Sequence, residues 1–263
     1  MVRFPEGLEP LDDLAPAQWV RDALKDWPSG RSFVVGDLVP PIFDAYARVL
    51  HRAHRPEDDL YPTGTWTERA EQLGRTIGPA TSWYELTGTN FGDGPGRDAW
   101  APNEGSLSET EVRVIASRLS DHTTTPLTCW FAMWSGWGEL SGGVGSLYGV
   151  GGPISELKMR WRTRQEGKRA RREAARFKTF PLLGGQRSYL LFNGAVEDAS
   201  RFDLGHGFRC PALSWPDDRA WFVHTEIDAM STYLGGSRAL VDRIVGEQVL
   251  ESFEVDQDSR AAM

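Results

Sequence analysis

The sequence predicts an α+β fold, in which an antiparallel or mixed sheet carries helices on one side. Some segments alternate or run continuously apolar as strands do, and others repeat apolar residues at helical spacing behind capping signals. The strands are not separated by regular helices, which argues against a doubly wound parallel sheet. The chain has 263 residues and is 40% hydrophobic, enough for a sizeable core. We therefore expect a single α+β domain over 1–263 with a Gly-rich and basic insertion at about 136–180.

Helices are predicted from caps followed by apolar periodicity. The first follows two aspartates and a proline, and two others open with a Ser/Thr-x-x-Glu capping box. A serine caps the last one. The predicted helices cover residues 19–27, 65–74, 108–119 and 237–245.

Strands are predicted where apolar residues alternate or form short runs. The segment 43–51 also fits a helix, although its alternation favours a strand, and 129–134 is apolar on both faces, as a buried strand is. The clearest alternation lies at 220–227. Residues 90–105 are predicted to form a loop, and the last dozen residues are expected to fray. The predicted strands cover 32–38, 43–51, 82–86, 129–134, 187–193 and 220–227.

Charge divides the chain into a basic segment and an acidic remainder. The net charge is −8, yet residues 158–178 carry ten lysines and arginines against two glutamates, which is +8 and leaves −16 for the rest. An acidic body repels phosphate backbones, so nucleic-acid binding is expected only through 158–178. A basic, low-complexity insertion is also typical of a solvated, flexible segment, and we predict that 158–178 lies outside the core.

The sequence contains no strong cofactor or catalytic motif. It has no P-loop, no GxGxxG opening a helix, no GxSxG and no HExxH, so we expect no cofactor. Its two cysteines, Cys129 and Cys210, are too few for a disulfide framework or a zinc site. No apolar run approaches membrane-spanning length, and Met1 to Asp13 does not read as a signal peptide. These features favour a cytoplasmic protein.

Four segments resemble one family. They are FPEGLEPLDD at the start, AYARVLH near residue 48, RSYLLFNGAV near residue 190 and SWPDDRAWFVHTEIDAMSTYLGGS at Ser214 to Ser237. They are similar to the corresponding blocks of a family of uncharacterised proteins from high-GC bacteria. The resemblance spans most of the chain except the basic insertion, and it implies a coherent fold without an assigned activity.

His224, Glu226 and Asp228 form the first candidate site. Alternate residues of a strand share a face, so these three side chains line one face and Trp221, Val223 and Ile227 fall on the other, which is expected to be buried. A histidine and two carboxylates on one face could hold a divalent metal. The same pattern is typical of the solvated face of a half-buried strand, and we favour that interpretation.

Two further candidates have ordinary structural explanations. His51 and His54 would share a helical face, but they stand at the end of an element beside a run of charges, which favours a solvated loop. Gly235, Gly236 and Ser237 could bind an anion through free backbone N–H groups at the start of the last helix. Glycines and serine are also the residues of a turn and an N-cap, which is the interpretation we prefer.

Tryptophan is abundant, with eleven residues in the chain. Most are expected in the core. Trp134 and Trp137 are flanked by Gly136 and Gly138, and we predict that this pair is accessible and forms a binding surface.

Two classes of function remain open at this stage. The first is a non-catalytic interaction protein, such as a regulatory or immunity-type module with a protein partner. The second is a metal-assisted hydrolase with its site at His224, Glu226 and Asp228. The lack of a catalytic motif favours the first.

Overall fold

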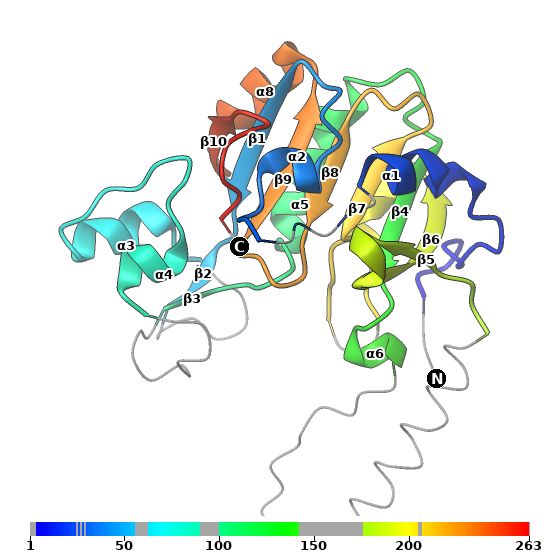
Figure 1. The fold of residues 1–263 in the computed structure, drawn as a ribbon, viewed down its shortest axis with the longest axis horizontal. Coiled ribbons are helices and arrows are strands. Elements are labelled where there is room, and N and C mark those ends of the chain that lie inside the picture. Colours follow the sequence, from blue (N-terminus) through cyan, green and yellow to red (C-terminus); the bar gives the residue numbers. More distant parts are fainter. Residues whose placement is uncertain are drawn as a thin grey trace, which may run out of the picture.

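An eight-stranded sheet forms the centre of the molecule, and every neighbouring pair of its strands is antiparallel (Figure 1). The computed structural model describes residues 4–24, 26, 28, 30–55, 63–89, 100–141, 176–204 and 207–262. The strand order is β10-β1-β9-β8-β7-β4-β6-β5. The strands are β1 (Ala45–Leu50), β4 (Cys129–Trp134), β5 (Phe180–Leu182), β6 (Arg187–Gly194), β7 (Leu213–Pro216), β8 (Phe222–Thr225), β9 (Ser231–Gly236) and β10 (Glu251–Val255), and a separate pair joins β2 (Ala53–His54) to β3 (Ala101–Pro102).

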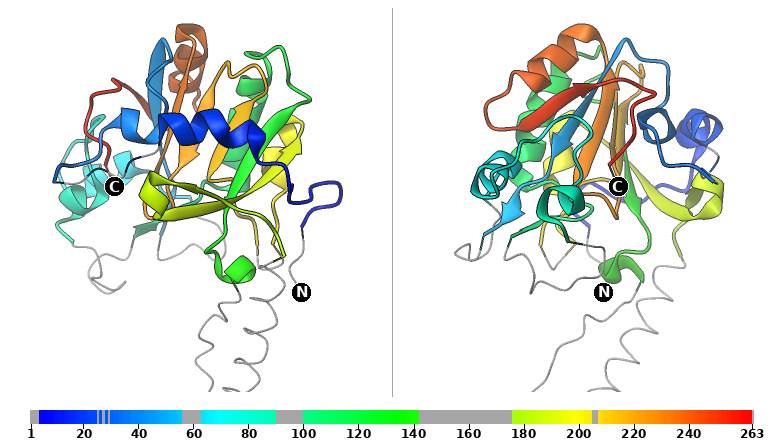
Figure 2. Two further views of the ribbon diagram at one scale, coloured as in Figure 1. Left: turned by 45° about the vertical axis from the view of Figure 1, so that its right-hand side comes forward. Right: turned by 60° about the vertical axis from the view of Figure 1, so that its left-hand side comes forward.

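Helices cover both faces of the sheet, so the expectation of helices on one side was wrong (Figure 2). We call the face under α5, α8 and η3 the back face and the face under α1 and α2 the front face. The central strands β4 and β8 are buried on both sides, and therefore each face needs a cover. The helical segments are η1 (Ala15–Ala17), α1 (Gln18–Ala23), α2 (Val35–Leu38), α3 (Trp66–Gln72), α4 (Trp83–Thr87), α5 (Glu109–Ser120), α6 (Gly138–Ser141), η2 (Leu183–Gly185), η3 (Val196–Arg201) and α8 (Arg238–Val245).

Several predicted elements are confirmed. The ambiguous segment at 43–51 is the strand β1, and the predicted strands at 129–134, 187–193 and 220–227 correspond to β4, β6 and β8. Both predicted capping boxes form: Thr65 and Glu68 cap α3, and Ser108 and Glu111 cap α5. Local capping signals were therefore enough to predict a helix where they stood directly before an apolar repeat.

Two predicted strands are helices instead. Residues 35–38 form α2, where the Asp37 carboxylate accepts the Val34 backbone N–H at 2.9 Å. Residues 83–87 form α4, where Ser82 and Glu85 make a reciprocal capping box. In both cases a carboxylate in the first turn satisfies a backbone N–H that would otherwise have no partner, and this outweighs the strand propensity of the apolar residues.

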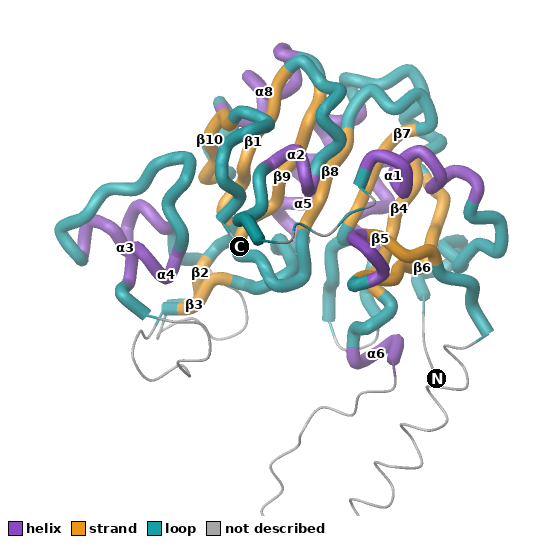
Figure 3. Tube along the Cα trace, in the orientation of Figure 1, coloured by secondary structure: helices purple, strands orange, loops and turns teal. Residues whose placement is uncertain are grey.

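Residues 252–262 are ordered, which corrects the expectation that the last dozen residues fray. Strand β10 pairs with β1, and the chain then runs beside α2 on the front face (Figure 3). Ser259 O and Gln257 O accept the backbone N–H groups of Val35 and Gly36, and the Ala262 N–H donates to the Tyr233 hydroxyl at 2.8 Å. These bonds tie the segment to α2, so the two together cover part of the front face.

Most of the predicted insertion at 136–180 falls outside the described residues. Within it, α6 and the start of β5 are described, and Phe180 is a fully buried residue of the sheet. Of the basic segment 158–178, the described part is 176–178. The predictions of flexibility and of nucleic-acid binding for that segment therefore lie largely outside the described residues. None of the described helices has the length and apolar character that crossing a bilayer requires.

Candidate functional site

Strand β8 and the turn after it place His224, Glu226 and Asp228 at one end of the front face. His224 and Glu226 are each 1% exposed, so the prediction that they line a solvated face was wrong. Asp228 is exposed. Trp221, Val223 and Ile227 are buried as predicted. The front face is buried here because α2, which is remote in sequence, packs over it. The His224 Nδ1 atom lies 2.6 Å from the Leu38 carbonyl at the end of α2.

Arg187 at the start of β6 occupies the space between the two carboxylates. Its Nε and Nη2 donate to Glu226 Oε1 at 2.8 and 2.5 Å, and Nη2 also donates to Asp228 Oδ2 at 2.6 Å. A guanidinium therefore supplies the positive charge that a metal ion would have supplied. Within the described ranges, no group of three or more His, Cys, Asp or Glu side chains is arranged to hold a metal. Sequence reasoning missed Arg187 because β6 and β8 are separated by β7 and β4 in the sheet.

The other oxygen of Glu226 faces histidine. Glu226 Oε2 lies 3.6 Å from His224 Nε2, and neither atom has another hydrogen-bond partner. Burial by itself would raise the pKa of Glu226, but the contacts with His224 and Arg187 lower it below its ordinary value. Glu226 is thus an ionised carboxylate held between two basic side chains.

Tyr189 on β6 completes this group. Its hydroxyl is buried without a hydrogen-bond partner, and burial together with the charge of Glu226 raises its pKa well above the usual value. The hydroxyl therefore keeps its proton and remains a donor. We call Arg187, Tyr189, His224, Glu226 and Asp228 the front-face cluster.

The predicted tryptophan pair lies at the same end of the sheet. Trp134, the last residue of β4, stands opposite Tyr189 of β6, and its ring meets that of Trp137 edge to face at 5.4 Å. Both tryptophans are partly buried. The Trp134 ring lies directly over Gly136, where a Cβ atom would collide with it, and the Arg209 guanidinium stacks on Trp137 at 4.6 Å. We call Trp134, Trp137 and Arg209 the aromatic rim.

The two histidines at 51 and 54 do not share a helix. His51 follows β1 and is fully buried, with Nδ1 donating to the Asn103 carbonyl at 2.7 Å and Nε2 at 2.9 Å from the Thr232 hydroxyl. His54 lies on β2 and is partly buried. The expectation of a solvated loop was wrong for His51, which takes part in a buried hydrogen-bond network. Burial lowers the pKa of His51 from 6.5 to about 4.

This shift predicts acid sensitivity. The unfolded chain binds a proton at His51 near pH 6.5, whereas the folded protein resists protonation until about pH 4. The free energy of unfolding should therefore fall as the pH is lowered from 6.5 to 4, by on the order of 3 kcal/mol for this one group. Urea unfolding at a series of pH values measures it. In His51→Gln the slope over this range should be markedly shallower, and an equal slope in both proteins would contradict the assignment.

The predicted anion site at Gly235, Gly236 and Ser237 is filled by neighbouring side chains. The two glycines are buried residues of β9, and a Cβ atom at these positions would collide with Phe43 or Leu240. The Ser237 hydroxyl accepts the Leu240 N–H and caps α8. These contacts agree with the capping interpretation.

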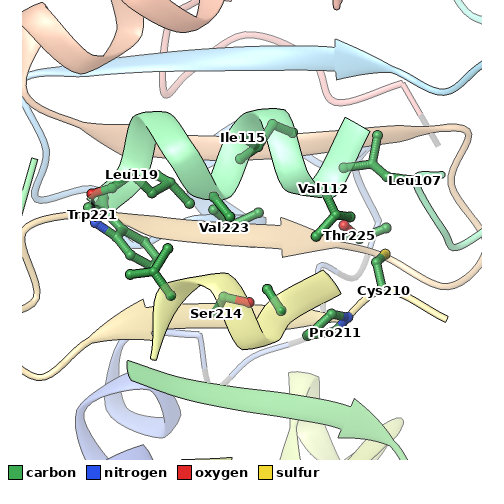
Figure 4. A pocket seen from close by; sticks show the side chains of 13 residues that line it. Leu107, Val112, Ile115, Leu119, Cys210, Pro211, Ser214, Trp221, Val223 and Thr225 are labelled. Atoms are coloured by element: carbon green, nitrogen blue, oxygen red, sulfur yellow. Dashed lines mark hydrogen bonds between the residues drawn. The ribbon is translucent and has the colours of Figure 1, made fainter. Parts of the chain in front are cut away.

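A small cavity lies on the back face between α5, η3 and the sheet (Figure 4). Its volume is about 30 Å³, room for a single water molecule, and its walls are mainly apolar. The side chains that line it include Ile115 and Leu119 of α5 and Val223 of β8 (Figure 4). The cavity is too small for a substrate.

Comparison of the chain with models of known protein families, with curated proteins and with solved structures found no match. The resemblance to a family from high-GC bacteria therefore stays a prediction.

Proposed function

We propose that the protein is a non-catalytic regulatory or immunity-type module that binds a protein partner through the aromatic rim. The observation that carries this proposal is the partly exposed Trp134–Trp137 pair with an arginine stacked on it. Tryptophan and arginine are the residues most enriched at binding hot spots, because they offer a large contact area together with polar groups. The rim thus combines two aromatic rings with the arginine stacked on one of them.

The front-face cluster supports a non-catalytic role. Its carboxylates are already bound by Arg187, and Glu226 and His224 are buried. A metal-assisted hydrolase needs ligands that are free to take up an ion and an open position for water. This second candidate function is less well supported, because Arg187 stands between the two carboxylates. Thermal melting with zinc, with manganese and with a chelator should show no specific shift.

A cytoplasmic location is part of the same proposal. Cys129 and Cys210 are buried free thiols, which fits a reducing compartment. Fractionation of the native host tests this point.

Replacing Trp137 with alanine is expected to weaken partner binding at least tenfold while the fold is kept, because a hot-spot tryptophan contributes about 2 kcal/mol or more. The partner is first isolated by cross-linking in the native host, and its Kd is then measured with purified proteins. Leu127→Ala is the matched control, since Leu127 is 77% exposed and lies beyond the opposite end of β4. Equal affinities for the wild type and Trp137→Ala would contradict the proposal.

A further inference from the structure

A chain of buried side-chain hydrogen bonds runs from the segment after β1 to the back face of β8. His51 Nδ1 lies 2.7 Å from the Asn103 carbonyl, and Nε2 lies 2.9 Å from the Thr232 hydroxyl on β9. The Thr232 hydroxyl in turn lies 2.7 Å from the hydroxyl of Thr225 on β8. His51, Thr225 and Thr232 are each at most 1% exposed, so bulk water does not reach the chain.

The carbonyl at one end fixes the direction of each bond in this chain. A carbonyl can only accept, so Nδ1 of His51 carries a proton, and burial keeps the ring neutral at pH 7 because it lowers the pKa to about 4. Nε2 therefore accepts from Thr232, and Thr232, having used its hydrogen, accepts from Thr225. The Thr225 hydroxyl has then used its own hydrogen as well, so any further partner of its oxygen must be a donor.

Thr225 is also one of three polar side chains that line the back-face cavity, together with Cys210 and Ser214 (Figure 4). Ser214 is 7% exposed, and its hydroxyl forms no hydrogen bond with the residues that the structure describes. A buried hydroxyl without a partner is costly, and buried polar groups are rarely left so. The cavity thus brings together a donor at Ser214 and an acceptor at Thr225.

Ser214 and Thr225 stand at a spacing that one water molecule can bridge. Ser214 is opposite Val223 in the β7–β8 pair, so Thr225 is its diagonal neighbour on the same face. Diagonal neighbours lie about 7–8 Å apart, which is too far for a direct bond between two short hydroxyl side chains. The cavity volume of about 30 Å³ exceeds the roughly 10–15 Å³ that a buried water needs, and three polar side chains match the bonds that such a water typically makes.

Cys210 offers a competing donor. Burial raises the pKa of its thiol despite contacts with Ser106 and Thr225, so the thiol keeps its hydrogen. A thiol is only a weak donor, and a bond from Cys210 to Thr225 would still leave the Ser214 hydroxyl without a partner. A water molecule satisfies both hydroxyls at once, with the Cys210 sulfur as a weak acceptor for its second hydrogen.

We propose that the back-face cavity is a binding site for one structural water molecule, which accepts from Ser214 and donates to Thr225. This water extends the hydrogen-bond chain of His51 across the sheet, from the segment after β1 through β9 and β8 to β7. The site does not depend on the proposed function of the aromatic rim.

The test is NMR of the full chain at pH 7. A water molecule held for longer than the tumbling time of the protein gives NOE and ROE cross-peaks of opposite sign, whereas surface water gives cross-peaks of the same sign. We expect opposite signs between water and the methyl groups of Ile115 and Val223, which line the cavity. Labelling with ¹⁵N-histidine, assigned by His51→Gln, should place the ring proton on Nδ1.

Ser214→Val removes the donor and puts a methyl group in the space of the water, so the cross-peaks should be lost. Thr225 keeps its hydroxyl in this variant, so cross-peaks relayed by that hydroxyl would persist, and their persistence would overturn the proposal. Ser200→Ala is the control and should keep the cross-peaks, because Ser200 donates to the Glu197 carbonyl at 3.0 Å and does not line the cavity.

A second variant covers the case in which Ser214→Val does not fold. Thr225→Val removes the acceptor at nearly constant volume and should lose the same cross-peaks. Two results on the wild type alone would also overturn the proposal. They are the absence of long-lived water at the Ile115 and Val223 methyl groups, and a ring proton of His51 on Nε2, which would reverse the direction of the chain.

Discussion

Replacing Glu226 with alanine is expected to lower the free energy of unfolding by about 3–5 kcal/mol, because it leaves two basic side chains in a buried region without their shared carboxylate. The Glu226 side chain is fully buried and that of Arg187 is only 12% exposed, so water cannot replace the two bonds that Arg187 loses, while its bond to Asp228 stays. Chemical denaturation at pH 7 measures the change.

Asp228→Ala is the matched control. Asp228 binds the same guanidinium, but its side chain is 59% exposed. A surface ion pair contributes about 0–1 kcal/mol, so this variant should stay within about 1 kcal/mol of the wild type. Similar losses of unfolding free energy in the two variants would show that the contribution of Glu226 to stability does not come from its burial.

Glu226 should also add to the loss of stability in acid. Its pKa is lower in the folded protein than in the unfolded chain, so its contribution is present above the ordinary glutamate range and disappears as the pH falls through the lowered value. As the pH is lowered, the loss of stability due to His51 comes first, between pH 6.5 and about 4. The two groups therefore act in successive pH ranges, and Glu226→Gln should remove only the more acidic part.

The elements that could be predicted carry their signals locally. The capping box of Thr65 and Glu68 predicts α3, and the alternation around Val223 predicts β8. Both signals can be recognised in the sequence because capping and strand periodicity depend on neighbouring residues. Strand β9 was missed. It ends in Gly235 and Gly236, which resemble a turn, but here the missing Cβ atoms make room for Phe43 and Leu240. That close approach comes from tertiary packing, which no local pattern contains.

The candidate site was half predictable for the same reason. The strand period placed His224 and Glu226 on one face, and the structure brings their side chains to 3.6 Å. Their burial depends on α2, and their charge partner is Arg187, which reaches them across the front face from β6. Covering segments and partners across a sheet follow from the topology, so the sequence could not reveal that an arginine would take the place of a metal.

Replacing Trp221 with alanine should lower the free energy of unfolding by about 3–5 kcal/mol, the range for a large buried aromatic residue. Trp221 is 1% exposed, its indole N–H donates to the Leu119 carbonyl at 3.1 Å, and its ring forms part of the wall of the back-face cavity. Removing the ring would enlarge a space that already exists, and α5 is held over it by its own contacts and cannot collapse freely into it.

Trp221→Phe separates the contribution of packing from that of the hydrogen bond. It keeps most of the packing and loses mainly the hydrogen bond, which contributes about 1 kcal/mol. Thermal and urea unfolding of both variants measure the difference. A melting temperature of Trp221→Ala equal to that of the wild type would mean that the back face of β8 is not part of the core.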